Sequence, residues 1–124
     1  MKLSVERKER TGPFGGAYYE TAIKVSLTSE EEQVARKQKI MNLALIGDGN
    51  PQSPDSAKLL HLCNRARLSL TDLSTGITAK ADGNQLGLLG WLEEEIRNQC
   101  KNIKNNIESD GDFSRGGESY EEEI

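Results

Sequence analysis

The sequence has few of the residues on which chemistry at an active site usually depends. It contains one histidine, His61, two cysteines, Cys63 and Cys100, and only 5% aromatic residues. A zinc site needs three or four ligands at suitable spacing, and no further cysteine or histidine lies near residues 61–63. A cysteine–histidine nucleophile remains an alternative, because such pairs meet in space, but no acidic residue that would orient the histidine stands beside them. We therefore expect no catalytic residues, no metal and no cofactor.

Long hydrophobic runs are also absent. The longest, Leu43–Ile46, is far shorter than the ~18 residues that a membrane span requires. The first ten residues are polar at every second position, whereas a signal peptide has a continuous apolar stretch. These features predict a cytoplasmic protein (in a host cytoplasm if the gene is viral), with its cysteines buried as small apolar groups.

Charge is unevenly distributed along the 124 residues, whose net charge is −4. Seven acidic residues and one arginine lie in 108–124, which gives that segment a charge of −6 and leaves about +2 on the rest. The segment 110–124 also has too few apolar residues to form a core. We interpret 1–109 as a single domain and 110–124 as a disordered, flexible acidic tail.

The first half of the chain predicts a β-hairpin followed by a helix. Residues 1–10 and 17–27 alternate between apolar and polar side chains, which is typical of half-buried strands, and the glycine-rich segment between them predicts a turn. Thr28 and Glu31 form a capping box, from which we expect a helix to about Ile46. The proline- and glycine-rich segment 48–56 then predicts a linker.

The second half predicts two more strands and a longer helix. We expect strands at 65–70 and 77–81 with a turn between them, while 57–64 fits either a short helix or a strand. Asp82 and Gln85 resemble a second capping pair at the start of a helix that ends near residue 109. Its apolar residues are spaced by three and four, as in a coiled-coil seam, with Glu93 and Arg97 flanking it in a favourable order: Leu89, Leu92, Ile96, Cys100, Ile103 and Ile107.

A similar pattern occurs twice, 54 residues apart. Three alternating residues from Ile23 and again from Ile77 are each followed by a capping residue and, three positions later, by an acid or amide. Two interpretations stay open: a duplication of ββα units at 1–47 and 57–109, or the capping that any strand-to-helix transition requires. Both predict an α+β fold of the ββαββα type, a two-layer sandwich with an antiparallel sheet and two helices on one face.

The missing catalytic groups favour a non-catalytic binding protein that acts through protein–protein contacts, as a small subunit of an assembly or an inhibitor. The apolar seam, or alternatively a sheet edge, also predicts a homo-oligomer. The sequence does not identify the protein partner. The candidate contact residues are aromatic residues near the first turn and apolar residues of the seam: Phe14, Tyr18, Leu89, Leu92, Ile96 and Ile103.

Two alternative functions remain. The first is binding or sequestration of a nucleotide or another anion in pockets at a dimer seam, with Arg65, Arg67, Asn98 and Asn102 as polar contacts. The second is weak nucleic-acid binding, which the nearly neutral charge of the predicted domain disfavours because few phosphate contacts are available.

Overall fold

The computed structural model describes residues 1–110 and 121–123. Most of the predicted acidic tail therefore lies outside the described residues. Among those described, no helix is both long and apolar enough to cross a membrane.

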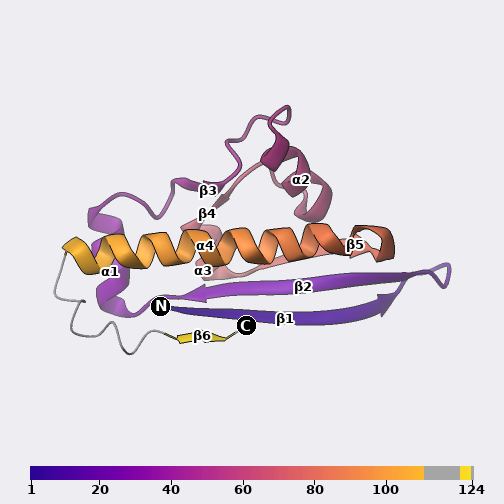
Figure 1. The fold of residues 1–124 in the computed structure, drawn as a ribbon, viewed down its shortest axis with the longest axis horizontal. Helices are drawn as coiled ribbons and strands as arrows, with labels where there is room; N and C mark the ends of the chain where they lie inside the picture. Colours follow the sequence, from indigo (N-terminus) through magenta and orange to yellow (C-terminus); the bar gives the residue numbers. More distant parts are fainter. Residues whose placement is uncertain (111–120, 124) are drawn as a thin grey trace.

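The chain has the α+β fold that the sequence predicts. Three long strands form an antiparallel sheet in the order β5-β2-β1, namely β1 (Lys2–Thr11), β2 (Ala17–Ser26) and β5 (Ile77–Asp82). A short strand, β6 (Glu121–Glu123), pairs in parallel with the start of β1. Figure 1 shows β1 and β2 as a long hairpin whose tip projects past the first turns of the longest helix.

Alternation of side chains along the strands gives the sheet one buried and one exposed face, as the period-two pattern predicts. Leu3, Ile23 and Val25 are buried, and so are Ala79 and Ala81 of β5, whereas the intervening residues of β2 and β5 between them are exposed. The register pairs Lys2 with Ser26 at one end of the hairpin and Thr11 with Ala17 at the other.

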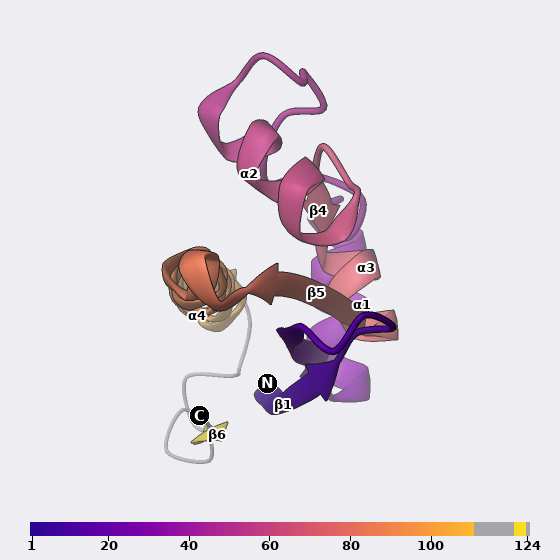
Figure 2. The same ribbon diagram turned by 90° about the vertical axis from the view of Figure 1, so that its right-hand side faces the viewer.

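The long C-terminal helix, α4 (Leu86–Asp110), covers the buried face of the sheet. A short 3₁₀ turn (Gly83–Gln85) leads into it from β5. Figure 2, seen nearly along the helix axis, shows α4 on one side of the sheet. The predicted apolar seam points into the core, where every one of its residues is buried: Leu89, Leu92, Ile96, Cys100, Ile103 and Ile107.

The first helix is shorter than predicted. Its capping box of Thr28 and Glu31 is present, but α1 (Ser29–Lys37) ends well before Ile46. Lys39 adopts a left-handed conformation with φ of 61°, which stops the helix. The following apolar residues form a strand, β3 (Ala44–Ile46), because they pair with a distant strand and bury Ile46.

The region 57–75 also differs from its prediction. A helix, α2 (Pro54–Cys63), covers most of 57–64 and ends at Asn64, which has a left-handed φ of 59°. The strand expected at 65–70 shrinks to β4 (Leu68–Ser69), because Ser69 and Asp72 cap a further helix, α3 (Leu70–Thr75), where we expected a turn.

The element order of the second half therefore differs from that of the first. β4 pairs with β3 in a separate two-stranded sheet and not with β5, so the half from α2 onward reads α2-β4-α3-β5-α4. The expected Asp82–Gln85 cap is also replaced. Asp82 accepts a hydrogen bond from the backbone of Asn84, while the Gln85 side chain contacts His61.

Candidate binding groove

A groove runs between β1 and the first half of α4, on the face of the sheet that the helix covers. It contains a cavity of about 370 Å³, which we call the β1–α4 pocket. Three segments contribute to it, one from each of β1, β2 and α4. The lining residues are Arg7, Lys8, Glu9, Tyr19, Glu20, Thr21, Leu86, Leu89, Gly90 and Glu93.

The pocket exists because the helix-covered face of the sheet becomes polar along its length. Leu3 of β1 and Val25 of β2 are paired and buried at the end of the hairpin from which the chain enters α1. Four pairs further along the hairpin, Arg7 lies opposite Thr21 on the same face. Arginine and threonine cannot continue a dry core, so the helix and the sheet separate around polar groups here.

Glu93 connects α4 to the sheet through hydrogen bonds at the floor of the pocket. Its side chain is only 8% exposed, although it carries a charge. Arg7 donates from Nε and Nη2 at 2.8 Å to the two carboxylate oxygens, and Thr21 donates its hydroxyl at 3.2 Å. The hydrogen bond between Arg7 and Glu93 raises the pKa of the Arg7 guanidinium. A two-pronged contact of this kind fixes the orientation of both groups.

The helix wall of the pocket has a gap where Gly90 stands. A Cβ atom built at Gly90 would meet no atom within 4 Å, and the same holds for Gly87 one turn earlier. Glycine inside a helix costs about 1 kcal/mol relative to alanine. No contact within the described residues requires either glycine, so the space beside Gly90 is open for another group.

The structure separates the predicted partner-binding residues into two groups. Leu89, Leu92, Ile96 and Ile103 are buried in the core of the chain itself, and of these only Leu89 reaches the pocket. Phe14, in contrast, is 100% exposed at the tip of the hairpin. Tyr18 is half-buried on the opposite face of the sheet, with the Lys80 ammonium 5.9 Å from its ring.

The predicted anion-binding residues are not joined into a site. Arg65 and Arg67 lie in the connection between α2 and β4, where Arg65 pairs with Asp72 at 3.0 Å. Asn98 and Asn102 are exposed on α4. Across the described residues, no hydrogen bond links these arginines to these asparagines.

His61 and Cys63 lie on α2, outside the pocket. The Cys63 thiol donates to the carbonyl of Leu59 at 3.3 Å, and burial raises its pKa, which disfavours the reactive thiolate. The exposed His61 ring contacts Gln85. In the part of the chain that the structure describes, no cluster of histidine, cysteine or acidic residues could hold a metal ion.

Sequence reasoning missed Arg7, Thr21, Gly90 and Glu93. Glu93 was expected to pair with Arg97 on the helix surface, but its carboxylate binds Arg7 across the sheet, 86 residues away, and Arg97 contacts another acid. One signal was present in the sequence. Arg7 continues the alternation that Leu3 and Val5 begin, which puts a charge on the apolar face.

No protein-family model matches this chain, and no curated protein or solved structure shows significant similarity to it.

Proposed function

We propose that this protein is a non-catalytic binding protein that holds a segment of a protein partner in the β1–α4 groove, either as a small subunit of an assembly or as an inhibitor. The observation that carries the proposal is the β1–α4 pocket itself. It has apolar walls from Tyr19, Leu86 and Leu89, an opening beside Gly90, and an exposed strand along one side.

The chemistry of the pocket favours an uncharged occupant. Its two most deeply placed polar groups, Glu93 and Thr21, are already hydrogen-bonded, and Arg7 neutralises the carboxylate. About 370 Å³ accommodates one bulky apolar side chain with its neighbouring backbone.

The same contacts argue against catalysis in the groove. A general acid or base must be free to exchange a proton with a substrate, whereas both oxygens of Glu93 accept hydrogen bonds within the chain. His61 and Cys63 do not line the pocket.

Both cysteines are free thiols, which supports a reducing compartment such as the cytoplasm.

Two matched glycine variants test the proposal. Peptides selected from a random phage-displayed library on the full chain are measured for binding to the wild type, to Gly90→Leu and to Gly87→Leu. A Cβ atom is sterically free at both positions, but only Gly90 lines the pocket. We expect Gly90→Leu to lose at least tenfold in affinity while Gly87→Leu binds like the wild type. Equal binding to both variants, or no enriched peptide, would refute the proposal.

Small-molecule binding in the same pocket is a second candidate, because the volume falls within the usual range for ligand sites. Neutralisation of Arg7 by Glu93 disfavours a nucleotide or another anion there. A thermal shift from a small-molecule panel in wild type but not in Gly90→Leu, together with no enriched peptide, would favour this candidate.

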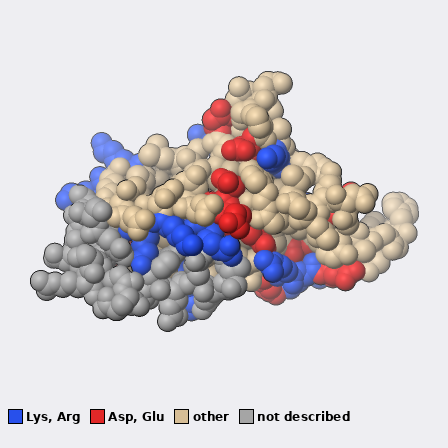
Figure 3. All heavy atoms as spheres, viewed as in Figure 1, with Lys and Arg blue, Asp and Glu red and all other residues tan. Residues whose placement is uncertain are grey.

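Nucleic-acid binding has less support. Figure 3 shows two groups of basic side chains on the side of the molecule that α4 covers, with acidic side chains directly beside and between them.

A further inference from the structure

Among the described residues, the outer edge of β1 is unpaired over most of its length. β6 pairs with that edge only at Lys2, Leu3 and Ser4. From Val5 to Thr11, no strand among the described residues pairs with it, although β2 satisfies the other edge throughout. An open edge presents unpaired N–H and C=O groups to any strand that fits it.

The charges on this open edge are self-complementary in one antiparallel register. The segment reads VERKERT, and placing Lys8 opposite Lys8 of a second copy puts Glu6 opposite Arg10 and Arg7 opposite Glu9. Each of these oppositely charged pairs then occurs twice by symmetry, against a single like-charged pair at the centre. Shifting the register by one residue in one direction puts Glu6 opposite Glu9 and Arg7 opposite Lys8, so like charges face each other instead.

The faces of the sheet agree with the same register. Residues directly opposite in an antiparallel pair project to the same face. Arg7 and Glu9 both line the pocket side, whereas Glu6 and Arg10 alternate with them on the other face. Both copies of α4 would therefore lie on one side of the joined sheet, and the contact would be a two-fold symmetric one between identical surfaces.

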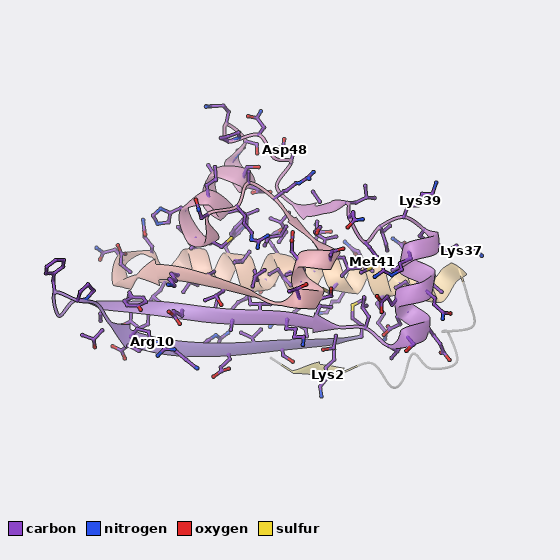
Figure 4. The ribbon with its side chains drawn as sticks, turned by 180° about the vertical axis from the view of Figure 1, so that it is seen from behind. Lys2, Arg10, Lys37, Lys39, Met41 and Asp48 are labelled. Carbon is purple, nitrogen blue, oxygen red and sulfur yellow. The ribbon has the colours of Figure 1, made fainter. Side chains whose placement is uncertain are left out.

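The side chains on this edge are exposed, although Glu6 pairs with Lys8 at 3.1 Å and Arg10 with Glu20 at 3.3 Å within the chain, so the contact would exchange these surface ion pairs for pairs between copies. All of residues 6–10 are exposed, and Glu9 forms no ion pair with the described residues. Arg7 binds Glu93 through Nε and Nη2, while its Nη1 donates no hydrogen bond in the described part of the chain. Since a guanidinium has five N–H donors, Arg7 can bind Glu93 and Glu9 of a second copy at once. Figure 4 shows Lys2 and Arg10 towards opposite ends of β1.

We infer that a second copy of this chain closes the open edge, with Val5–Thr11 of the two copies paired antiparallel about Lys8. This goes beyond the proposed partner binding, because it assigns the sheet edge to self-association and leaves the two β1–α4 pockets on the same side of the joined sheet. It also identifies the homo-oligomer contact as the sheet edge, since the seam of α4 is buried within each chain.

Charge-reversal variants test the register. Glu6→Lys places like charges opposite Arg10 of the second copy, and Arg10→Glu does so opposite Glu6. We expect each variant alone to dimerise on the order of tenfold more weakly than wild type in sedimentation equilibrium, because two attractive pairs become repulsive. An equimolar mixture of the two variants should form heterodimers with near wild-type affinity, because positions 6 and 10 are again oppositely charged across the contact.

Lys24→Glu is the matched control. Lys24 lies on the exposed face of β2, away from the open edge, and its substitution makes the same charge change as Arg10→Glu. It should leave the dimer unchanged. A wild-type chain that stays monomeric at millimolar concentration would overturn the inference, and so would a mixture that associates no better than its separate components. The restored heterodimer also shows that both variants are folded.

A cysteine at the two-fold axis provides an independent test. Lys8→Cys should form a disulfide-linked dimer on mild oxidation, because only position 8 meets its own copy. Glu6→Cys and Arg10→Cys should link when mixed but not alone. Linking of Glu6→Cys to itself, with Lys8→Cys unlinked, would refute the register.

Discussion

The ion pair beneath α4 should respond asymmetrically to the loss of either partner. Arg7→Ala leaves the Glu93 carboxylate, 8% exposed, with the Thr21 hydroxyl as its remaining hydrogen-bond donor among the side chains described above. Glu93→Gln has a different effect, because the Arg7 side chain is 67% exposed and can turn towards water. Removal of the arginine therefore leaves a charge buried, whereas neutralisation of the glutamate does not.

The expected magnitudes follow from this difference in exposure. An unpaired buried charge costs about 3–5 kcal/mol, and the remaining bond from Thr21 together with partial solvent screening reduces this to about 2–3 kcal/mol for Arg7→Ala. Glu93→Gln keeps the shape and an amide oxygen that can accept a hydrogen bond, so we expect a loss of about 1 kcal/mol.

Urea unfolding at one low protein concentration, followed by the fluorescence of the single tryptophan, Trp91, gives these free energies of unfolding. Arg10→Ala is the control, since Arg10 lies on the same strand and pairs at 3.3 Å with Glu20, whose side chain is more exposed than that of Glu93. It should cost under about 1 kcal/mol. If Arg7→Ala costs no more than Arg10→Ala, Glu93 is not desolvated and our account of the pocket floor is wrong.

Three further substitutions test other parts of the structure. Gly87→Ala should raise the melting temperature by about 4 °C in a thermal scan, because a Cβ is sterically free there and alanine favours the helix; a lower melting temperature would contradict this. Gly47→Ala should cost about 3 kcal/mol or more in urea unfolding, because φ is +76° and the new Cβ would come 2.4 Å from the carbonyl oxygen of Ala66; a neutral effect would mean that this crossing of the chain is looser than described. Burial raises the pKa of Asp72, but hydrogen bonds from Ser69 and a neighbouring arginine outweigh it, so the net pKa is below the ordinary value. The carboxylate therefore stabilises the fold above about pH 4, and this contribution is lost as the pH falls through its folded-state pKa; Asp72→Asn should lower stability at pH 7, and the difference from the wild type should shrink as the pH falls below about 4, whereas a pH-independent difference would refute this.

The sequence predicts the parts of the fold whose burial follows a simple period. Alternation identifies β1, β2 and β5, because each has one face in the core, and the spacing of three and four identifies α4. The capping box at Thr28 also predicts the start of α1 correctly. These signals are local, so one segment of sequence carries each of them.

The misplaced elements depend on distant partners. The end of α1 and the start of β3 depend on pairing between Ala44–Ile46 and Leu68–Ser69, which no local pattern reveals. The prediction of the candidate site was wrong for the same reason. A local rule assigned Glu93 to Arg97, whereas its partner Arg7 reaches it only once the hairpin and the helix have come together.

The two halves of α4 pack on the sheet through different kinds of contact. From Ile96 to Ile107 the helix is held by continuous apolar burial, whereas in its first turns the buried Leu89 and Leu92 alternate with Gly87, Gly90, a cavity and one ion pair. Local opening requires less free energy where few apolar contacts are lost. Backbone amides in the first turns should therefore exchange with deuterium faster than those near Ile103. A partner seated beside Gly90 would slow that exchange, so amide exchange along α4 can report occupancy of the groove even before the partner is identified.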